Sequence, residues 1–142
     1  MTYNEALQNA INGDAIFIVG SGFSIGAKNC LDEDDGQLWV GSILAQHLSE
    51  LTDMEPDIQL DIVSQEYIER YGEKQMVDYL KQHYTVESYE DYYKALTKIK
   101  NLRVYSTNYD NLIEKICSDC GTKIHGYSID TCLLYTSDAA DE

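Results

Sequence analysis

Basic residues are scarce in this chain of 142 residues, which has 10 lysines and arginines against 25 aspartates and glutamates. The net charge of −15 argues against nucleic acids and anionic membranes as partners, because both are recognised by basic patches. No apolar run is long enough to span a bilayer. Because no secretory leader is recognisable either, we expect a cytoplasmic protein whose four cysteines are reduced.

The carboxyl-terminal residues 132–142 are unlike the rest of the chain. They read Cys-Leu-Leu-Tyr-Thr-Ser-Asp-Ala-Ala-Asp-Glu and resemble the translation of a transposon-end sequencing adaptor. We therefore expect 1–131 to be the amino-terminal part of one domain of a longer protein, and we exclude the tail from fold reasoning. A native acidic terminus is the alternative that composition leaves open.

An apolar run leads into a glycine-rich loop near the start of the chain. The five apolar residues from Ala15 to Val19 predict a buried strand of a parallel sheet. Gly20 and Gly22 then let the backbone turn tightly and approach a ligand, and a helix beginning near Phe23 would direct its N–H groups at a phosphate. The spacing is not the full Gly-x-Gly-x-x-Gly fingerprint, so a tight turn without a ligand is the alternative.

Helical periodicity governs most of the remaining chain. Thr2 and Glu5 have capping-box spacing before an apolar stripe that ends near Gly13. Residues 39–99 carry four further stripes, with Pro56 expected in the first turn of the second helix. The start of the fourth helix is expected at Ser88 and Asp91, and the tyrosines on these stripes are expected in the core. We treat His47 and His83 as structural, and the acidic run 32–36 as a solvated loop.

A second strand-to-helix junction follows the helical region. Leu102 to Ser106 reads as a strand, and apolar spacing from Tyr109 onward predicts a helix. Asn108 and Asp110 therefore lie at the carboxyl end of a predicted strand, where open parallel sheets bind ligands. Plain capping of the helix is the alternative, with Asn108 or Thr107 as the cap and Asp110 facing the helix dipole.

Together, the two junctions resemble the sirtuin-like family, and above all its bacterial antiphage-defence branch, whose members hydrolyse NAD. Gly20-Ser21-Gly22-Phe23-Ser24 is similar to the family's Gly-Ala-Gly-x-Ser loop, and Thr107-Asn108-Tyr109-Asp110 to its Thr-Asn-Tyr-Asp motif. The resemblance covers residues 15–130. It implies an α/β fold, namely a Rossmann-like parallel sheet with a helical insertion between the two motif strands, here truncated at the carboxyl terminus.

The resemblance also implies roles for individual residues. NAD would be held by the loop residues Gly20, Ser21, Gly22, Phe23 and Ser24, and by Thr107. Asn108 would be catalytic and position water near the nicotinamide ribose, while Asp110 would hold Asn108 and the ribose hydroxyls. Cleavage would proceed through an oxocarbenium-like transition state and release nicotinamide and ADP-ribose. His125, followed by Gly126, fits the family's catalytic histidine by residue type, although 123–127 can also be read as the next strand.

Two departures separate this chain from the deacylating sirtuins. It has no Pro-Asp-Phe-Arg-like segment after the glycine loop, and it has no four-cysteine zinc module. Cys117 and Cys120 have the spacing of half a zinc site, but they lie on an apolar helical stripe, so we expect buried thiols and no metal. The alternatives to NAD hydrolysis are a non-catalytic sensor of NAD or ADP-ribose and an NAD-dependent deacylase. A homo-oligomer, or an effector or sensor domain in the missing part, is left open.

Overall fold

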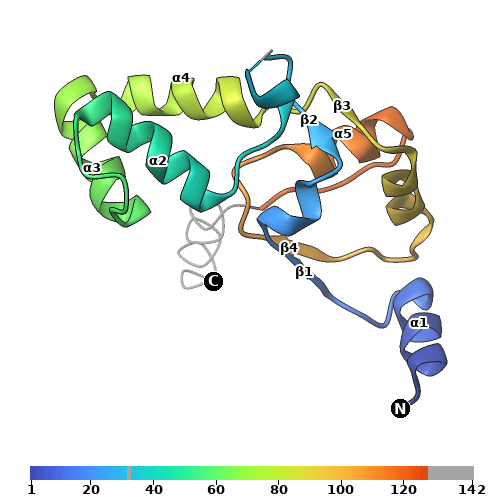
Figure 1. Cartoon of the computed structure of the whole chain (residues 1–142). Helices are drawn as coiled ribbons and strands as arrows, with labels where there is room; N and C mark the ends of the chain where they lie inside the picture. Colours follow the sequence, from blue (N-terminus) through green and yellow to red (C-terminus); the bar gives the residue numbers. More distant parts are fainter. Residues whose placement is uncertain (32, 128–142) are drawn as a thin grey trace, which may run out of the picture.

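The computed structural model describes residues 1–31 and 33–127, so the predicted adaptor tail at 132–142 lies outside the described residues. Figure 1 shows the arrangement of the elements. In chain order they are α1 (Tyr3–Asn12), β1 (Phe17–Val19), η1 (Ser21–Ser24), β2 (Ala27–Lys28), η2 (Glu33–Gly36), α2 (Gly41–Thr52), α3 (Leu60–Tyr71), α4 (Glu73–Tyr84), β3 (Ser88–Tyr89), η3 (Asp91–Lys98), β4 (Val104–Ser106) and α5 (Leu112–Asp119), where η denotes a 3-10 helix.

The two predicted motif strands pair in parallel. Phe17 of β1 lies opposite Val104 of β4, and the register continues to Val19 opposite Ser106. The helices α2, α3 and α4 lie between these strands in the sequence, as the expected helical insertion requires. The fold is therefore mixed α/β with a small parallel sheet, and the described part of that sheet has two strands.

The prediction that the first strand is fully buried is wrong. Ile18 is 80% exposed and its register partner Tyr105 is 66% exposed, so one face of the β1–β4 pair is open to solvent. An apolar strand is buried only when a second layer covers it, and no described helix covers this face.

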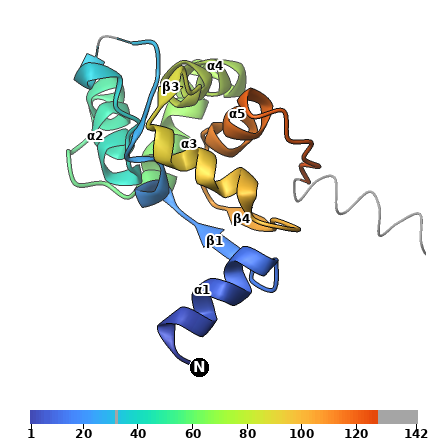
Figure 2. The same ribbon diagram turned by 90° about the vertical axis from the view of Figure 1, so that its right-hand side faces the viewer.

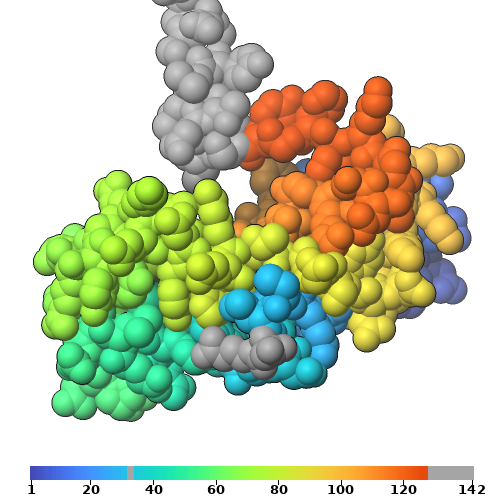
Figure 3. Space-filling model, turned by 90° about the horizontal axis from the view of Figure 1, so that it is seen from above, coloured from blue at the N-terminus to red at the C-terminus, as the bar shows by residue number. Residues whose placement is uncertain are grey.

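The inserted helices form one packed unit. α2 packs against α3, and α3 packs against α4. Their core contains these buried residues: Trp39, Leu44, Ala45, Leu48, Val63, Tyr67, Met76 and Tyr84. Figure 3 shows this green part of the chain on one side of the molecule, and the orange residues around α5 on the other. A second buried cluster, centred on α5, contains Ala27, Leu38, Val86, Tyr93, Leu112 and Ile116.

Several local expectations inside the insertion are wrong. Pro56 lies in a turn before α3, which begins only at Leu60. The expected fourth helix is present from Asp91 to Lys98 as the 3-10 helix η3, but Ser88–Tyr89, expected at its start, forms the short strand β3. β3 pairs antiparallel with β2, and this non-local pairing overrides the helical periodicity at Tyr89.

Aromatic packing in the insertion follows the predicted stripes in part. Tyr67, Tyr84 and Tyr93 are buried, as expected, whereas Tyr92 is 63% exposed. The two histidines that we interpreted as structural, His47 and His83, both stack on Trp39, with ring centroids 3.9 Å and 4.0 Å away.

The first helix has the predicted ends. Thr2 Oγ1 accepts a hydrogen bond from the backbone N–H of Glu5, and Glu5 Oε2 accepts one from the N–H of Thr2, which completes a capping box. No residue of α1 is buried, and Figure 2 shows the helix extending away from the rest of the molecule. The helix is therefore amphipathic in sequence, and its apolar face is not covered by any other described part of the chain.

Gly13, which ends α1, is a position where a side chain should be costly. Its φ of +88° lies in the left-handed region, and a Cβ there would collide with the backbone carbonyl of Lys100. We expect Gly13→Ala to lower the free energy of unfolding by about 1 kcal/mol or more, measured by chemical denaturation. Gly126→Ala is the control, because a Cβ at Gly126 meets no atom within 4 Å. Equal stability of the two variants would contradict this account.

Candidate functional site

The two motifs meet because β1 and β4 end side by side. The N–H of Thr107, directly after β4, donates to the carbonyl of Val19 at 3.2 Å, so the parallel pairing continues to the strand ends. The Thr107 hydroxyl donates to the same carbonyl at 3.4 Å. Residues 20–24 and 107–110 thus leave the sheet from the same edge, as sequence analysis predicts for a site at the carboxyl ends of parallel strands.

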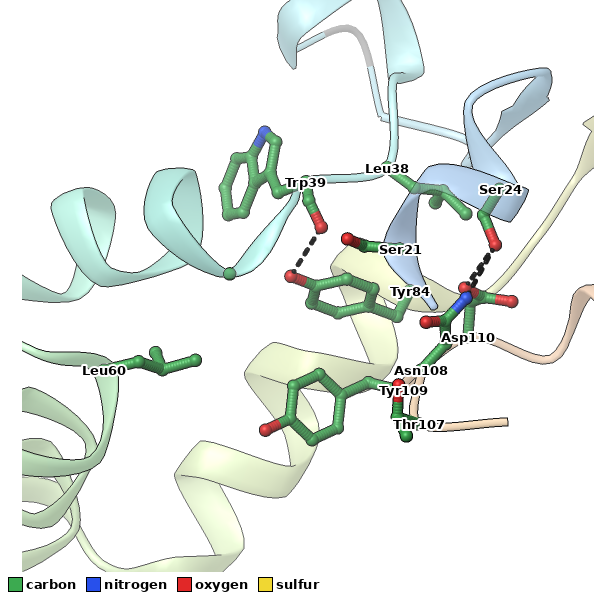
Figure 4. A pocket seen from close by; sticks show the side chains of 11 residues that line it. Ser21, Ser24, Leu38, Trp39, Leu60, Tyr84, Thr107, Asn108, Tyr109 and Asp110 are labelled. Atoms are coloured by element: carbon green, nitrogen blue, oxygen red, sulfur yellow. Dashed lines mark hydrogen bonds between the residues drawn. The ribbon is translucent and has the colours of Figure 1, made fainter. Parts of the chain in front are cut away.

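The side-chain amide of Asn108 connects the two motifs directly. Its Nδ2 donates to the Gly20 carbonyl at 3.0 Å. It also donates to Ser24 Oγ at 3.1 Å, and this second bond is drawn in Figure 4. A primary amide has two N–H donors and one oxygen acceptor. Because both donors are engaged, Oδ1 is the group that Asn108 can offer to a ligand or a water molecule.

Capping, the alternative role for Asn108 and Thr107, is wrong. Helix α5 begins at Leu112, and its N-cap is Asn111, three residues after Asn108 along the chain. The carboxylate that supports this helix belongs to Asp110, whose Oδ1 accepts a hydrogen bond from the N–H of Leu112 at 3.1 Å. Asn108 is therefore held by the glycine loop and not by the helix.

Ser24 is the centre of a short polar chain. Its side chain is buried, with 2% of the residue exposed, and its Oγ donates to Asp110 Oδ2 at 2.7 Å while accepting from Asn108. The resemblance implies that Asp110 holds Asn108. The structure connects the two through the Ser24 hydroxyl, and Asp110 is itself fixed to the start of α5.

A cavity of about 220 Å³ opens in front of this polar chain. Its lining residues are Ser21, Ser24, Leu38, Trp39, Gly41, Leu60, Tyr84, Thr107, Asn108, Tyr109 and Asp110. Figure 4 shows the polar side chains gathered on one side, with Leu60 opposite them across the cavity. Among these lining residues, Asp110 is the one with a charged side chain, so the cavity has an acidic end and largely apolar and aromatic walls.

Two aromatic residues, Trp39 and Tyr84, form a wall of the cavity that sequence analysis missed. The Tyr84 hydroxyl donates to the Trp39 carbonyl at 3.1 Å, which fixes the end of α4 to the start of α2. Trp39 and Tyr84 belong to the core of the helical unit, whereas Leu38 belongs to the cluster around α5. Their apolar spacing indicated core positions, and nothing in it distinguishes a core tyrosine from one that also faces a cavity.

The helix predicted after the glycine loop is a short 3-10 helix and not an α-helix. η1 is a 3-10 turn of four residues, from Ser21 to Ser24, so the macrodipole of a long helix is absent here. Ser21 and Ser24 line the cavity, whereas Gly22 and Phe23 line a separate one. Tyr93 fixes the turn from behind, because its hydroxyl donates to the Phe23 carbonyl and accepts from the N–H of Gly26.

His125 is not among the residues that line the cavity. It lies in an exposed, irregular segment after α5, so the alternative interpretation of 123–127 as a strand is wrong. Of the two cysteines expected to be buried, Cys117 is buried and Cys120 is exposed. Burial raises the pKa of the Cys117 thiol, which keeps it protonated. Among the described residues, no group of three His, Cys, Asp or Glu side chains is placed to hold a metal ion.

In comparisons with known proteins, no family model, no curated protein and no solved structure matches this chain. Within residues 1–31 and 33–127, none of the helices has the length and apolar character needed to cross a membrane. The interpretation of the site consequently depends on its own geometry and on the two sequence motifs.

The Ser24 hydroxyl should stabilise the fold as well as the site. Ser24→Ala removes the donor to Asp110 and one acceptor of Asn108, leaving partly buried polar atoms without these partners. We expect the free energy of unfolding to fall by about 1–2 kcal/mol, measured by urea denaturation. Ser42→Ala, at an exposed position of α2, is the control and should change stability little. An unchanged midpoint for Ser24→Ala would show that this polar chain contributes nothing.

Alkaline pH should destabilise the protein through Tyr84. Burial, with smaller contributions from Tyr109 and Asp110, raises the pKa of Tyr84 to about 12. Between pH 10 and 12 the unfolded chain loses a proton that the folded protein retains, so the free energy of unfolding should decrease as the pH rises through this range. In Tyr84→Phe the decrease should be shallower, as followed by denaturation at a series of alkaline pH values. Tyr105→Phe, at an exposed position of β4, is the matched control, and an equal slope in both variants would contradict the assignment.

Proposed function

We propose that this chain is the NAD-binding part of a sirtuin-like enzyme that hydrolyses NAD to nicotinamide and ADP-ribose. The observation that carries the proposal is the Asn108 amide, which Gly20 and Ser24 of the glycine loop hold with its oxygen left to act on a ligand. An asparagine held in this way is suited to orient a water molecule or a sugar hydroxyl. The cap role that could have explained this residue does not apply.

The cavity has the size and charge for one end of the dinucleotide. At about 220 Å³ it is smaller than the roughly 300–1,000 Å³ of sites that enclose a whole drug-sized ligand. The nicotinamide ring of oxidised NAD carries a positive charge, and Asp110 supplies the one formal charge of the lining, which is negative. Tyr109, which lines the cavity and is 61% exposed, offers a flat aromatic face to a planar ring.

Hydrolysis breaks the glycosidic bond between the nicotinamide nitrogen and C1′ of the ribose. The bonding electrons leave with nicotinamide, which becomes neutral, and positive charge develops on the ribose ring. Asn108 Oδ1 would accept a hydrogen bond from the attacking water, whose oxygen bonds to C1′ and which releases one proton. The Asp110 carboxylate stabilises the developing positive charge. Ser24 holds the side chains of Asp110 and Asn108 in place through its two hydrogen bonds.

One observation favours a second candidate, a sensor that binds NAD or ADP-ribose without cleaving it. The family histidine is matched by residue type at His125, which does not line the cavity. Among the lining residues, Asp110 is therefore the one whose side chain could act as a general base. Both of its carboxylate oxygens already accept hydrogen bonds, which favours binding without cleavage. An antiphage role, with an effector or sensor domain elsewhere in a longer protein, belongs to the same proposal through the sequence resemblance.

Substitution of Asn108 should separate catalysis from structure. We expect Asn108→Ala to lower the rate of nicotinamide release by about 10²–10³, the scale for loss of one oriented polar group from a transition state. Asn108→Asp would place a carboxylate oxygen against the Gly20 carbonyl, and Asn108→Ser is too short to bridge the motifs, so both should also be impaired. The measurements are calorimetric NAD binding by the chain and nicotinamide release by the longer reading frame.

Asn12→Ala, at the exposed end of α1, is the control for loss of an asparagine and should behave as the parent. Near-normal release by Asn108→Ser would sink the catalytic assignment. NAD binding without release by the parent would favour the sensor. An absence of NAD binding by the parent would reject both candidates.

A further inference from the structure

The end of α4 meets the second motif at two points. The ring of Tyr84, the last residue of the helix, packs edge to face against the ring of Tyr109, with centroids 5.7 Å apart and planes at 66°. Figure 4 shows these two rings next to each other at the cavity. Two residues after Tyr84, the backbone N–H of Val86 donates to Asn111 Oδ1 at 2.8 Å. The helical insertion is therefore joined directly to the segment that carries Asn108.

The two tyrosine rings differ in how firmly they are held. Tyr84 is buried, with 6% of the residue exposed, and its hydroxyl donates to the Trp39 carbonyl at 3.1 Å. Tyr109 is 61% exposed, and among the described residues Tyr84 supplies its one contact with another aromatic ring. Because aromatic pairs prefer an edge-to-face or offset geometry, the fixed ring restricts the directions in which the exposed ring can point.

Asn111 supports the same junction and not its own helix. It is the N-cap residue of α5, a position where an asparagine side chain usually accepts a hydrogen bond from an N–H of the first turn. Within the described helix its side chain forms no such bond, and the oxygen accepts from Val86. The chain is thus anchored before Tyr109 by Asn108 and after it by Asn111, so the direction of the Tyr109 ring depends on its contact with Tyr84.

We propose that Tyr84 is a positioning residue, which orients the ring of Tyr109 so that its face stacks on the planar ring of a ligand in the cavity beside Asn108. This inference rests on the proposed NAD site, where the planar ring is nicotinamide. A side chain that already points toward the ligand loses fewer conformations on binding, so preorganisation increases the affinity. Tyr84 acts through Tyr109 and does not need to contact the ligand itself.

A double-mutant cycle tests whether Tyr84 acts through Tyr109. The probe is nicotinamide mononucleotide, titrated into the full chain by calorimetry. We expect Tyr109→Ala to weaken binding by up to about tenfold, the scale of one aromatic contact. Tyr84→Leu should weaken binding by a similar factor when Tyr109 is present. In the Tyr109→Ala background it should weaken binding no further, because the effects of two residues that act together are not additive.

Two further variants separate positioning from a loss of stability. Tyr84→Phe keeps the ring and should restore most of the affinity that Tyr84→Leu loses. Tyr67→Leu is the matched control, because Tyr67 is also a buried tyrosine of the helical unit but does not line the cavity. It should lower the melting temperature, as Tyr84→Leu does, and should leave the affinity at the value of the parent.

The direction of the Tyr109 ring can also be followed without a ligand. Three-bond couplings measured by NMR report the χ1 rotamer of Tyr109. We expect one rotamer in the parent and in Tyr67→Leu, and averaged couplings in Tyr84→Leu.

A single Tyr109 rotamer in Tyr84→Leu would overturn the positioning role, and so would additive losses of affinity in the double variant. An equal loss of affinity in Tyr67→Leu would overturn it as well, because any destabilised core would then have the same effect. Averaged couplings in Tyr84→Leu, with no binding of nicotinamide mononucleotide by the parent, would support the positioning role and count against the proposed NAD hydrolysis.

Discussion

The parallel pairing of β1 with β4 is the constraint on which the rest of the site depends. It joins segments far apart in the chain, and its last hydrogen bond, from Thr107 to Val19, sets the distance between the two loops that follow. Asn108 can reach the Gly20 carbonyl and Ser24 only in this register. A shift of the register by one residue would turn each side chain that follows β4, including Asn108, to the other face of the sheet and would separate the two motifs.

The helical insertion converts this strand edge into a cavity. Without α2–α4 the polar chain from Asn108 through Ser24 to Asp110 would lie on an open surface, where water weakens each electrostatic interaction. The insertion begins after Leu38 and Trp39 and ends at Tyr84. The hydrogen bond from the Tyr84 hydroxyl to the Trp39 carbonyl joins these two ends at one wall of the cavity. The cavity therefore lies between the two buried clusters, so each contributes part of its lining.

Features fixed by neighbouring residues were predictable from the sequence, and features fixed by distant ones were not. The capping box of Thr2 and Glu5, the end of α1 at Gly13 and the strand before Thr107 follow from local chemistry. The exposure of Ile18 and the pairing of Ser88–Tyr89 with β2 depend on which other layers and strands are present. At the site, the residue types of both motifs indicated a shared ligand, but the hydroxyl of Ser24 as the link between Asn108 and Asp110 needed coordinates.

The open face of β1 and β4 bears on how these molecules behave toward one another. Ile16, Ile18 and Tyr105 form an apolar row on short strands whose described outer edges have unpaired backbone groups, the arrangement that favours strand-to-strand association between chains. The net charge of −15 opposes such association through mutual repulsion. Acidification toward the isoelectric point near 4.3 removes this charge, and concentrated salt screens it. Charge repulsion therefore keeps the protein dispersed. When that repulsion is removed, the exposed face of β1 and β4, the strands that build the site, is where chains would associate.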